Sequence, residues 1–66
     1  MKNTIKIERA ILNITQEDLA KKVDVSRQTT NSIENNRYVP STILALKIAD
    51  VFNKTVNEVF ELDEDD

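Results

Sequence analysis

The chain has 66 residues, enough for one small domain near the lower size limit for independent folding. Its formal net charge is −3, and the absence of Cys and His excludes disulfides, the usual zinc sites and the commonest catalytic base. No signal peptide is evident, and no segment approaches the ~20 apolar residues of a membrane span. We therefore expect a soluble cytoplasmic protein that needs no metal or other cofactor and is not an enzyme.

The first predicted helix, at about Asn3–Leu12, has an irregular apolar stripe formed by Ile5, Ile7, Ile11 and Leu12. The second begins after Thr15, which forms a capping-box-like T-x-x-D with Asp18. Its buried face is expected to comprise Leu19, Ala20 and Val23. The third begins after the N-cap Ser26, and the residues expected inside it and in the turn before it are Thr30, Ile33 and Val25. Residues 15–35 therefore predict two short helices joined by a tight turn.

The rest of the chain predicts two more helices after an extended loop, Asn35–Pro40. The proline disfavours helix at the residue before it, and the serine that follows caps a fourth helix at Thr42–Phe52. The spacing i, i+3, i+4, i+7 places in the central core Ala45, Ile48, Ala49 and Phe52. The fifth helix starts at the capping box Thr55–Glu58 and presents Val56, Val59 and Phe60. The segments Lys2–Thr4 and Phe60–Leu62 are expected to pair as a short β-ribbon.

Glycine is absent from the chain, although it is the usual residue just past the end of a helix. The residues found where helices should end are Asn13, Asp24, Asn36 and Asn53. Asn and Asp tolerate the left-handed backbone conformation best after glycine. We therefore expect these four residues to adopt it.

The start of the third helix carries an unusual cluster of polar side chains, Arg27, Gln28, Thr29, Asn31 and Ser32. A helix that only packs into a core does not need them, whereas a helix that enters the major groove of DNA does. Arg pairs with G and Gln or Asn with A through two hydrogen bonds, each pair contributing about 1–3 kcal/mol of discrimination. This helix is therefore a candidate for reading DNA bases.

The pattern Q-x-x-L-A-x-x-x-x-V-S-x-x-x-x-x-x-I-E-N-x-x-Y-x-P spans Gln16 to Pro40. It resembles the phage Cro/repressor-type (XRE-like) helix-turn-helix regulators, and the resemblance extends over essentially the whole chain. It implies an all-α fold, a compact five-helix lambda-repressor-like domain over residues 1–66, to which the terminal β-ribbon would add. The helix-turn-helix would lie at about residues 15–35, with an acidic tail at residues 61–66.

The resemblance implies a sequence-specific double-stranded DNA-binding regulator, a repressor that binds a palindromic operator as a homodimer. Half-sites would be about one DNA turn, roughly 34 Å, apart. The implied base-reading residues are Arg27, Gln28 and Ser32, with Thr29 and Asn31 beside them able to read bases or touch phosphates. The implied phosphate-binding residues are Thr15, Gln16, Ser26, Asn35, Arg37 and Tyr38. For Gln16 and Arg27, the alternative is an exposed residue that only aids solubility.

The resemblance also implies a salt bridge between Arg9 and Glu34 that sets the angle of the third helix. Short members of this family tend to dimerise through the fifth helix and the segment after it, here Val56, Val59, Phe60 and Leu62. The alternative is that this helix only covers the domain's own core. Three features depart from the family pattern: Thr30 replaces an apolar residue, Asn36 replaces Gly, and Glu8 and Leu12 exchange the expected apolar and polar positions.

Two other functions share these features: an antitoxin that represses its own operon, and a helix-turn-helix module that binds only proteins. The antitoxin would need a surface for its toxin, and the short acidic tail Glu61–Asp66 is the candidate. A protein-binding module has no reason to keep phosphate- and base-reading residues. The simplest interpretation of the tail is a solvated, frayed terminus. Its functional alternatives are a weak cation site or repulsion that limits non-specific DNA binding.

Overall fold

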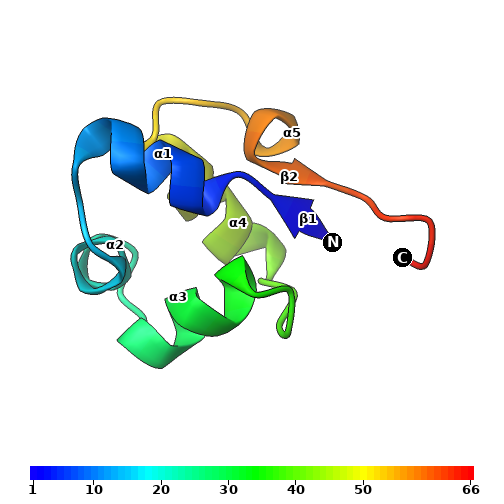
Figure 1. Ribbon diagram of the computed structural model, residues 1–66, viewed down its shortest axis with the longest axis horizontal. Coiled ribbons are helices and arrows are strands. Elements are labelled where there is room, and N and C mark those ends of the chain that lie inside the picture. The colour runs from blue at the N-terminus through cyan, green and yellow to red at the C-terminus, as the bar shows by residue number, and fades with distance from the viewer.

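The computed structural model describes all 66 residues as five helices and a two-stranded sheet (Figure 1). In chain order the elements are β1 (Lys2–Asn3), α1 (Ile5–Leu12), α2 (Gln16–Lys22), α3 (Arg27–Glu34), α4 (Thr42–Val51), α5 (Val56–Val59) and β2 (Phe60–Glu61). The strands pair antiparallel, with Lys2 opposite Glu61 and Asn3 opposite Phe60, which confirms the predicted ribbon. The first helix starts at Ile5 because Asn3 belongs to the strand. None of the helices is long and apolar enough to span a membrane.

Polar side chains set the starts of α2 to α5, as the sequence predicts. The hydroxyl oxygens of Thr15, Ser26 and Ser41 each accept a hydrogen bond from the backbone N–H three residues on, at 3.0, 3.1 and 3.2 Å. At α5, the Glu58 carboxylate accepts from the backbone N–H and the hydroxyl of Thr55, at 2.9 and 3.0 Å. Backbone donors that a helix start leaves unpaired are satisfied in this way.

The left-handed residues confirm how a chain without glycine ends its helices. The backbone φ angles are 56° at Asn13, 60° at Asp24, 60° at Asn36 and 56° at Asn53. These are the only residues with positive φ, and each lies just past a helix. Their short polar side chains reduce the steric cost of this conformation.

Every helix contributes a large, fully buried apolar side chain to the core. These residues, each at most 2% exposed, are Ile5, Leu19, Ile33, Ile48 and Val59. In Figure 1, α4 lies in the middle of the molecule with α1, α3 and α5 around it. The four core residues predicted for this helix region are buried, and Leu44 joins them. The core therefore fixes how α2 and α3 sit relative to the rest of the domain.

The apolar stripe expected on α1 does not face the core as a whole. Ile7 and Ile11 are 61% and 69% exposed, Leu12 is half-exposed, and the buried residues of the helix are Ile5 and Glu8. The Glu8 carboxylate is 2.8 Å from the Lys54 ammonium, which follows α4 in the chain. A buried carboxylate is tolerated when it is paired in this way. The same hydrogen bond raises the pKa of Lys54.

In the structure, the acidic tail makes ion pairs with the start of the chain. The N-terminal ammonium of Met1 lies 3.2 Å from the Asp63 carboxylate and 3.1 Å from the Asp66 carboxylate. The Lys2 ammonium lies 3.7 Å from Asp63. Because β1 pairs with β2, the first residues of the chain lie beside the residues that follow β2. The β-ribbon thus brings together the cationic start and the anionic end of the chain.

Candidate nucleic-acid interface

One buried hydroxyl, that of Thr30 in α3, joins α3 to the start of α2. Thr30 is 1% exposed, and its Oγ1 donates to the Arg27 carbonyl oxygen at 2.7 Å. A second carbonyl, that of Gln16 at the start of α2, lies 3.3 Å from the same hydroxyl. Thr at a position that is usually apolar is therefore satisfied by its own helix and by the neighbouring one.

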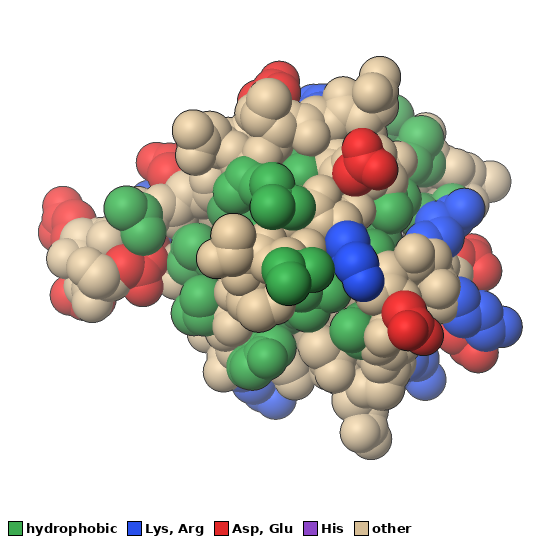
Figure 2. Space-filling view, turned by 180° about the vertical axis from the view of Figure 1, so that it is seen from behind, with side chains coloured by type: hydrophobic (Ala, Val, Ile, Leu, Met, Phe, Trp, Pro, Cys, Tyr) green, Lys and Arg blue, Asp and Glu red, His purple; other side chains and the backbone are tan.

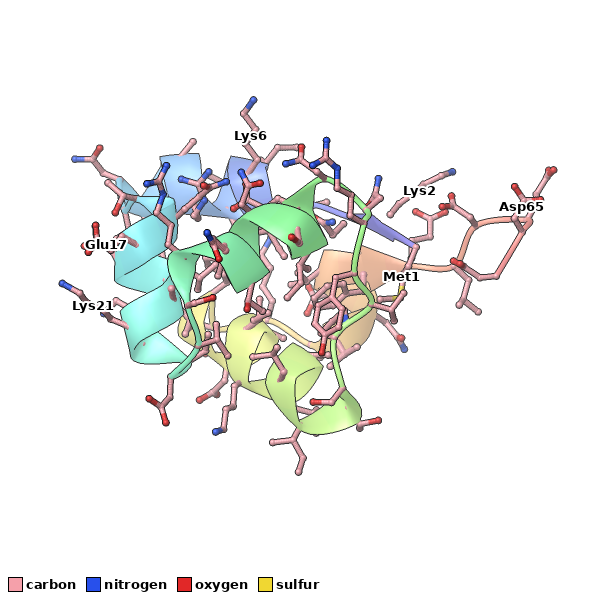
Figure 3. All side chains as sticks on the ribbon, turned by 90° about the horizontal axis from the view of Figure 1, so that it is seen from below. Met1, Lys2, Lys6, Glu17, Lys21 and Asp65 are labelled. Carbon is pink, nitrogen blue, oxygen red and sulfur yellow. The ribbon has the colours of Figure 1, made fainter.

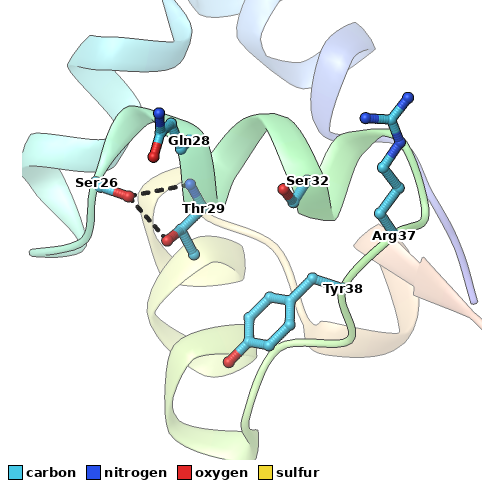
Figure 4. Close-up of a pocket in the computed structure, with 6 residues that line it drawn as sticks. All are labelled: Ser26, Gln28, Thr29, Ser32, Arg37 and Tyr38. Atoms are coloured by element: carbon cyan, nitrogen blue, oxygen red, sulfur yellow. Dashed lines mark hydrogen bonds between the residues drawn. The ribbon is translucent and has the colours of Figure 1, made fainter.

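Three adjoining hollows cover the outer side of α3 and the start of α2. The first, about 280 Å³, is lined by Ser26, Gln28, Thr29, Ser32, Arg37 and Tyr38 (Figure 4). The second, about 510 Å³, is lined by Arg27, Gln28, Asn31 and Ser32. The third, about 430 Å³, is lined by Arg9, Ile14, Thr15, Gln16, Glu17 and Arg27. Because neighbouring hollows share lining residues, they form one continuous surface, which we call the polar band.

The polar band contains every residue predicted to read bases or bind phosphates except Asn35. These residues come from three segments: the start of α2, the outer side of α3, and the loop that carries Arg37 and Tyr38. In Figure 4, α3 lies across the view from Ser26 toward Arg37, with α2 near its first residues, Arg37 past its other end and Tyr38 below it. The outer side of α3 is therefore flanked by α2 on one side and by this loop on the other.

Some of these side chains are already engaged within the chain. The Ser26 and Thr29 hydroxyls lie 3.0 Å apart, and Ser26 also accepts from the Thr29 backbone N–H (Figure 4). Asn31 and Asn35 bond to each other, and Asn31 reaches Gln16. The predicted DNA-contacting side chains that make no hydrogen bond within the chain are Arg27, Gln28, Ser32, Arg37 and Tyr38. These are the groups free to bind an outside partner.

Arg9 and Glu34 join the first helix to the end of α3. The Arg9 Nε and Nη2 donate to the two Glu34 carboxylate oxygens at 3.0 and 2.9 Å, and Nη1 donates to the Ile14 carbonyl oxygen at 3.1 Å. The two side chains are 15% and 6% exposed. Glu34 is the only acidic residue of α3, and its charge is paired with that of Arg9. The outer side of α3 therefore carries no unpaired negative charge.

The start of α2 combines a capping box with a perturbed carboxyl group. The Asp18 carboxylate accepts from the Thr15 backbone N–H at 2.9 Å, and the Thr15 hydroxyl oxygen accepts from the Asp18 backbone N–H at 3.0 Å. The hydrogen bond from the Thr15 backbone lowers the pKa of Asp18. The Asp18 carboxylate is thus engaged at the helix start, and the residues of this end that line the polar band are Thr15, Gln16 and Glu17.

The acidic tail lies away from the polar band. In Figure 3, Glu17 and Lys21 of α2 lie at one end of the view, and Met1, Lys2 and Asp65 lie at the other, with α3 between them. Figure 2 shows acidic side chains gathered on the projecting end of the molecule. No group of three or more His, Cys, Asp or Glu side chains is arranged to hold a metal ion.

The two short helices α2 and α3, joined by a tight turn, have the arrangement of a helix-turn-helix, and comparison with known protein families gives the same result. Residues 5–59 match the helix-turn-helix family. The chain belongs to the XRE-type helix-turn-helix family. The sequence match and the arrangement of the helices therefore both identify a helix-turn-helix domain. The matched residues include all five helices.

Three relatives of this XRE-type chain cover almost its whole length. An uncharacterized HTH-type transcriptional regulator of Methanocaldococcus jannaschii is 50% identical over 66 residues, 100% of both chains. Another, of Archaeoglobus fulgidus, is 47% identical over 66 residues, 100% of this chain and 93% of the relative. The uncharacterized HTH-type transcriptional regulator YgzD of Bacillus subtilis is 46% identical over 65 residues, 98% of each chain.

The residues predicted to form a dimer interface divide into two groups. Val59 and Phe60 are 1% and 6% exposed inside the core of the chain, and Val56 packs against that core. For these residues the structure favours the alternative that α5 covers its own domain. Leu62 is 74% exposed and remains available to a partner.

Two exposed apolar residues of α4 were not singled out from the sequence. Ile43 and Leu46 are 68% and 55% exposed and lie three residues apart, so they share one face of the helix. The available signal was the excess of apolar residues on α4 beyond those needed for the core. Figure 2 shows hydrophobic side chains spread over the face of the molecule seen from behind.

Proposed function

We propose that this protein is a DNA-binding transcriptional repressor that binds a palindromic operator as a homodimer, with α3 in the major groove. The observation that carries the proposal is the polar band, in which unpaired Arg27 and Gln28 project from the start of α3. The full-length relatives that are named transcriptional regulators support the same class of function.

The flanks of α3 match the two walls of a major groove. A helix in the groove has a sugar-phosphate backbone on each side, and phosphate contacts fix its register. Gln16 lies on the α2 side of the polar band, and Arg37 and Tyr38 lie on the loop side. We assign Gln16 to one backbone and Arg37 with Tyr38 to the other.

The side chains between these flanks suit base recognition. Arg27 and Gln28 are exposed and free of hydrogen bonds within the chain, and their chemistry fits G and A respectively. The hydroxyl of Ser32 can donate or accept, so it suits several bases. The band contains one acidic residue, Glu17, which lies 3.7 Å from Lys21, so positive charge prevails near the groove.

The homodimer follows from the size of the domain. A single module of this kind covers little DNA, and two copies related by a two-fold axis double the contacts. The molecule measures 30 × 22 × 20 Å, so two copies side by side can place their α3 helices about one DNA turn apart. We propose that exposed Leu62, and the α4 pair Ile43 and Leu46, supply apolar surface for this contact.

Repression follows from binding alone, because a dimer on a site that overlaps a promoter excludes the polymerase. The proposal is tested by selecting bound duplexes from a random DNA pool and measuring affinity across salt. We expect a two-fold-related motif with half-sites about ten base pairs apart and an affinity that falls steeply with salt. If folded protein enriches no sequence, the proposal is wrong.

A further inference from the structure

Three side-chain amides form a chain that runs from the end of α3 to the start of α2. The Asn35 Nδ2 donates to the Asn31 backbone carbonyl oxygen at 3.0 Å and to the Asn31 Oδ1 at 3.2 Å. The Asn31 Nδ2 donates in turn to the Gln16 Oε1 at 3.4 Å. We call this chain the amide relay.

The relay has a direction, and a backbone carbonyl sets it. A carbonyl oxygen can only accept a hydrogen bond, so the group of Asn35 beside it must be the NH₂. That NH₂ also faces the Asn31 Oδ1, which places the Asn31 NH₂ on the opposite side, toward Gln16. The Gln16 oxygen must then accept, because its partner is a donor.

The orientation of Gln16 matters because an amide side chain has two chemically opposite ends. With its oxygen held by Asn31, Gln16 presents its NH₂ outward, and this is the end that can donate to a phosphate oxygen. The reverse orientation would present an acceptor to an anion. The Asn31–Gln16 bond is the longest of the three, so the relay biases the orientation rather than locking it.

We propose that Asn31 is a positioning residue that aims the Gln16 amide at a DNA phosphate, and that it does not read a base. This inference rests on the proposed DNA-binding function. The sequence suggests that Asn31 reads a base or contacts a phosphate directly. We assign it instead an indirect role, in which it orients the Gln16 side chain. Asn31 is half-buried between α2 and α3, and its amide groups already have partners at both ends.

The test is a double-mutant cycle on the selected operator duplex, with Gln16→Ala, Asn31→Ala and the combined variant. A hydrogen bond to a charged group is worth enough that Gln16→Ala should weaken binding by about ten-fold or more. Asn31→Ala should weaken it by a smaller factor, about three-fold, and by no further factor once Gln16 is absent. Independent contacts would instead give penalties that multiply.

A second readout separates positioning from base reading. Repeating the selection with Asn31→Ala should return the same motif as the unmodified protein, because a phosphate contact carries no sequence information. Arg27→Ala serves as the matched variant that should relax the preference at one base pair. Thermal melting of each variant controls for folding, since Asn31 and Arg27 both lie on α3.

The outcomes separate the two proposals. Loss of the Asn31 effect in the Gln16→Ala background, with an unchanged motif, supports the relay. If the unmodified protein selects a motif but the two penalties multiply, or if Asn31→Ala changes the motif, the relay is overturned while the DNA-binding function stands. If the unmodified protein selects no motif, the proposed function fails and the relay fails with it.

Discussion

Arg9 and Glu34 are 25 residues apart in the chain and share two parallel hydrogen bonds of 3.0 and 2.9 Å. The pair ties α1 to the end of α3, whose opposite end carries Arg27 and Gln28. Because both side chains are mostly buried, removing one partner leaves an uncompensated charge in the interior. The geometry of the polar band therefore depends on an ion pair that joins α1 to α3 and whose Arg9 lines the band.

We predict that Glu34→Ala destabilises the protein strongly, approaching the roughly 3–5 kcal/mol typical of a broken buried pair. The matched variant is Glu17→Ala, since the Glu17 side chain is 63% exposed and lies 3.7 Å from Lys21. A surface pair of that kind contributes about 0–1 kcal/mol. Chemical unfolding of the two variants gives the comparison, and equal losses would show that the Arg9–Glu34 pair has no special structural role.

Substitutions in the polar band should divide into two kinds of DNA-binding defect. Arg27→Ala and Gln28→Ala should each cost about 1–3 kcal/mol at one base pair and relax its identity. Arg37→Ala should weaken binding about equally for all sequences and reduce the salt slope by about one. Competition of variant duplexes at several salt concentrations distinguishes them. A sequence-dependent loss on changing Arg37 would reassign that residue to base reading.

Two substitutions that introduce a charge test the proposed dimer surface without disturbing the core. Leu62→Glu and Leu46→Glu should weaken self-association, because both side chains are more than half exposed and apolar. Exposed substitutions of this kind change the free energy of unfolding by only about 0.5 kcal/mol. Sedimentation velocity measures the association, and circular dichroism confirms that helicity is kept. If neither change alters the sedimentation of a dimeric protein, the interface lies elsewhere.

Acid should weaken the protein through the two capping boxes. Hydrogen bonds from Thr15 and from Thr55 lower the pKa of Asp18 and of Glu58 below their usual values of 3.8 and 4.5. A lowered folded-state pKa gives stability that is present above the unfolded value and is lost as pH falls through the folded one. The denaturant concentration at the midpoint of unfolding should therefore decrease progressively as the pH falls below those usual pKa values.

The matched variants are Asp18→Asn and Glu58→Gln, which cannot ionise. Each should be less stable than the unmodified protein at neutral pH, and the difference should shrink in acid because the unmodified carboxylate is then protonated as well. Urea unfolding across the acid range measures this convergence. A difference that stays constant with pH would show that the capping carboxylates do not carry the acid sensitivity.

Part of the candidate site could be predicted, because the residues proposed to contact DNA are marked in the sequence by their side-chain chemistry and their spacing. Arg27, Gln28, Arg37 and Gln16 were singled out from the sequence, and the structure places them on one surface. The assignment of Asn31 could not be refined in this way. Its partners, Gln16 and Asn35, are defined by how α3 lies on α2, and no local signal reports that angle.

The starts of α2 to α5, the left-handed residues at the helix ends and the core of α4 follow from the amino-acid sequence alone, because each depends on residues within one or two turns. A cap joins residues three apart, a left-handed residue needs only its own side chain, and a buried face repeats every three or four positions. That is why the roles of Thr15, Asn13 and Ile48 could be predicted from their neighbours in the chain.

The distant partners of polar groups, by contrast, are settled by how the elements pack in three dimensions. Burial of the Glu8 carboxylate is tolerated because Lys54, 46 residues away in the chain, pairs with it, while Ile7 and Ile11 on the same helix face outward. The acidic tail meets the Met1 ammonium because two short strands pair. Such contacts depend on the packing of whole elements against a shared core, and hydrophobic periodicity describes the core but not the partners at its edge.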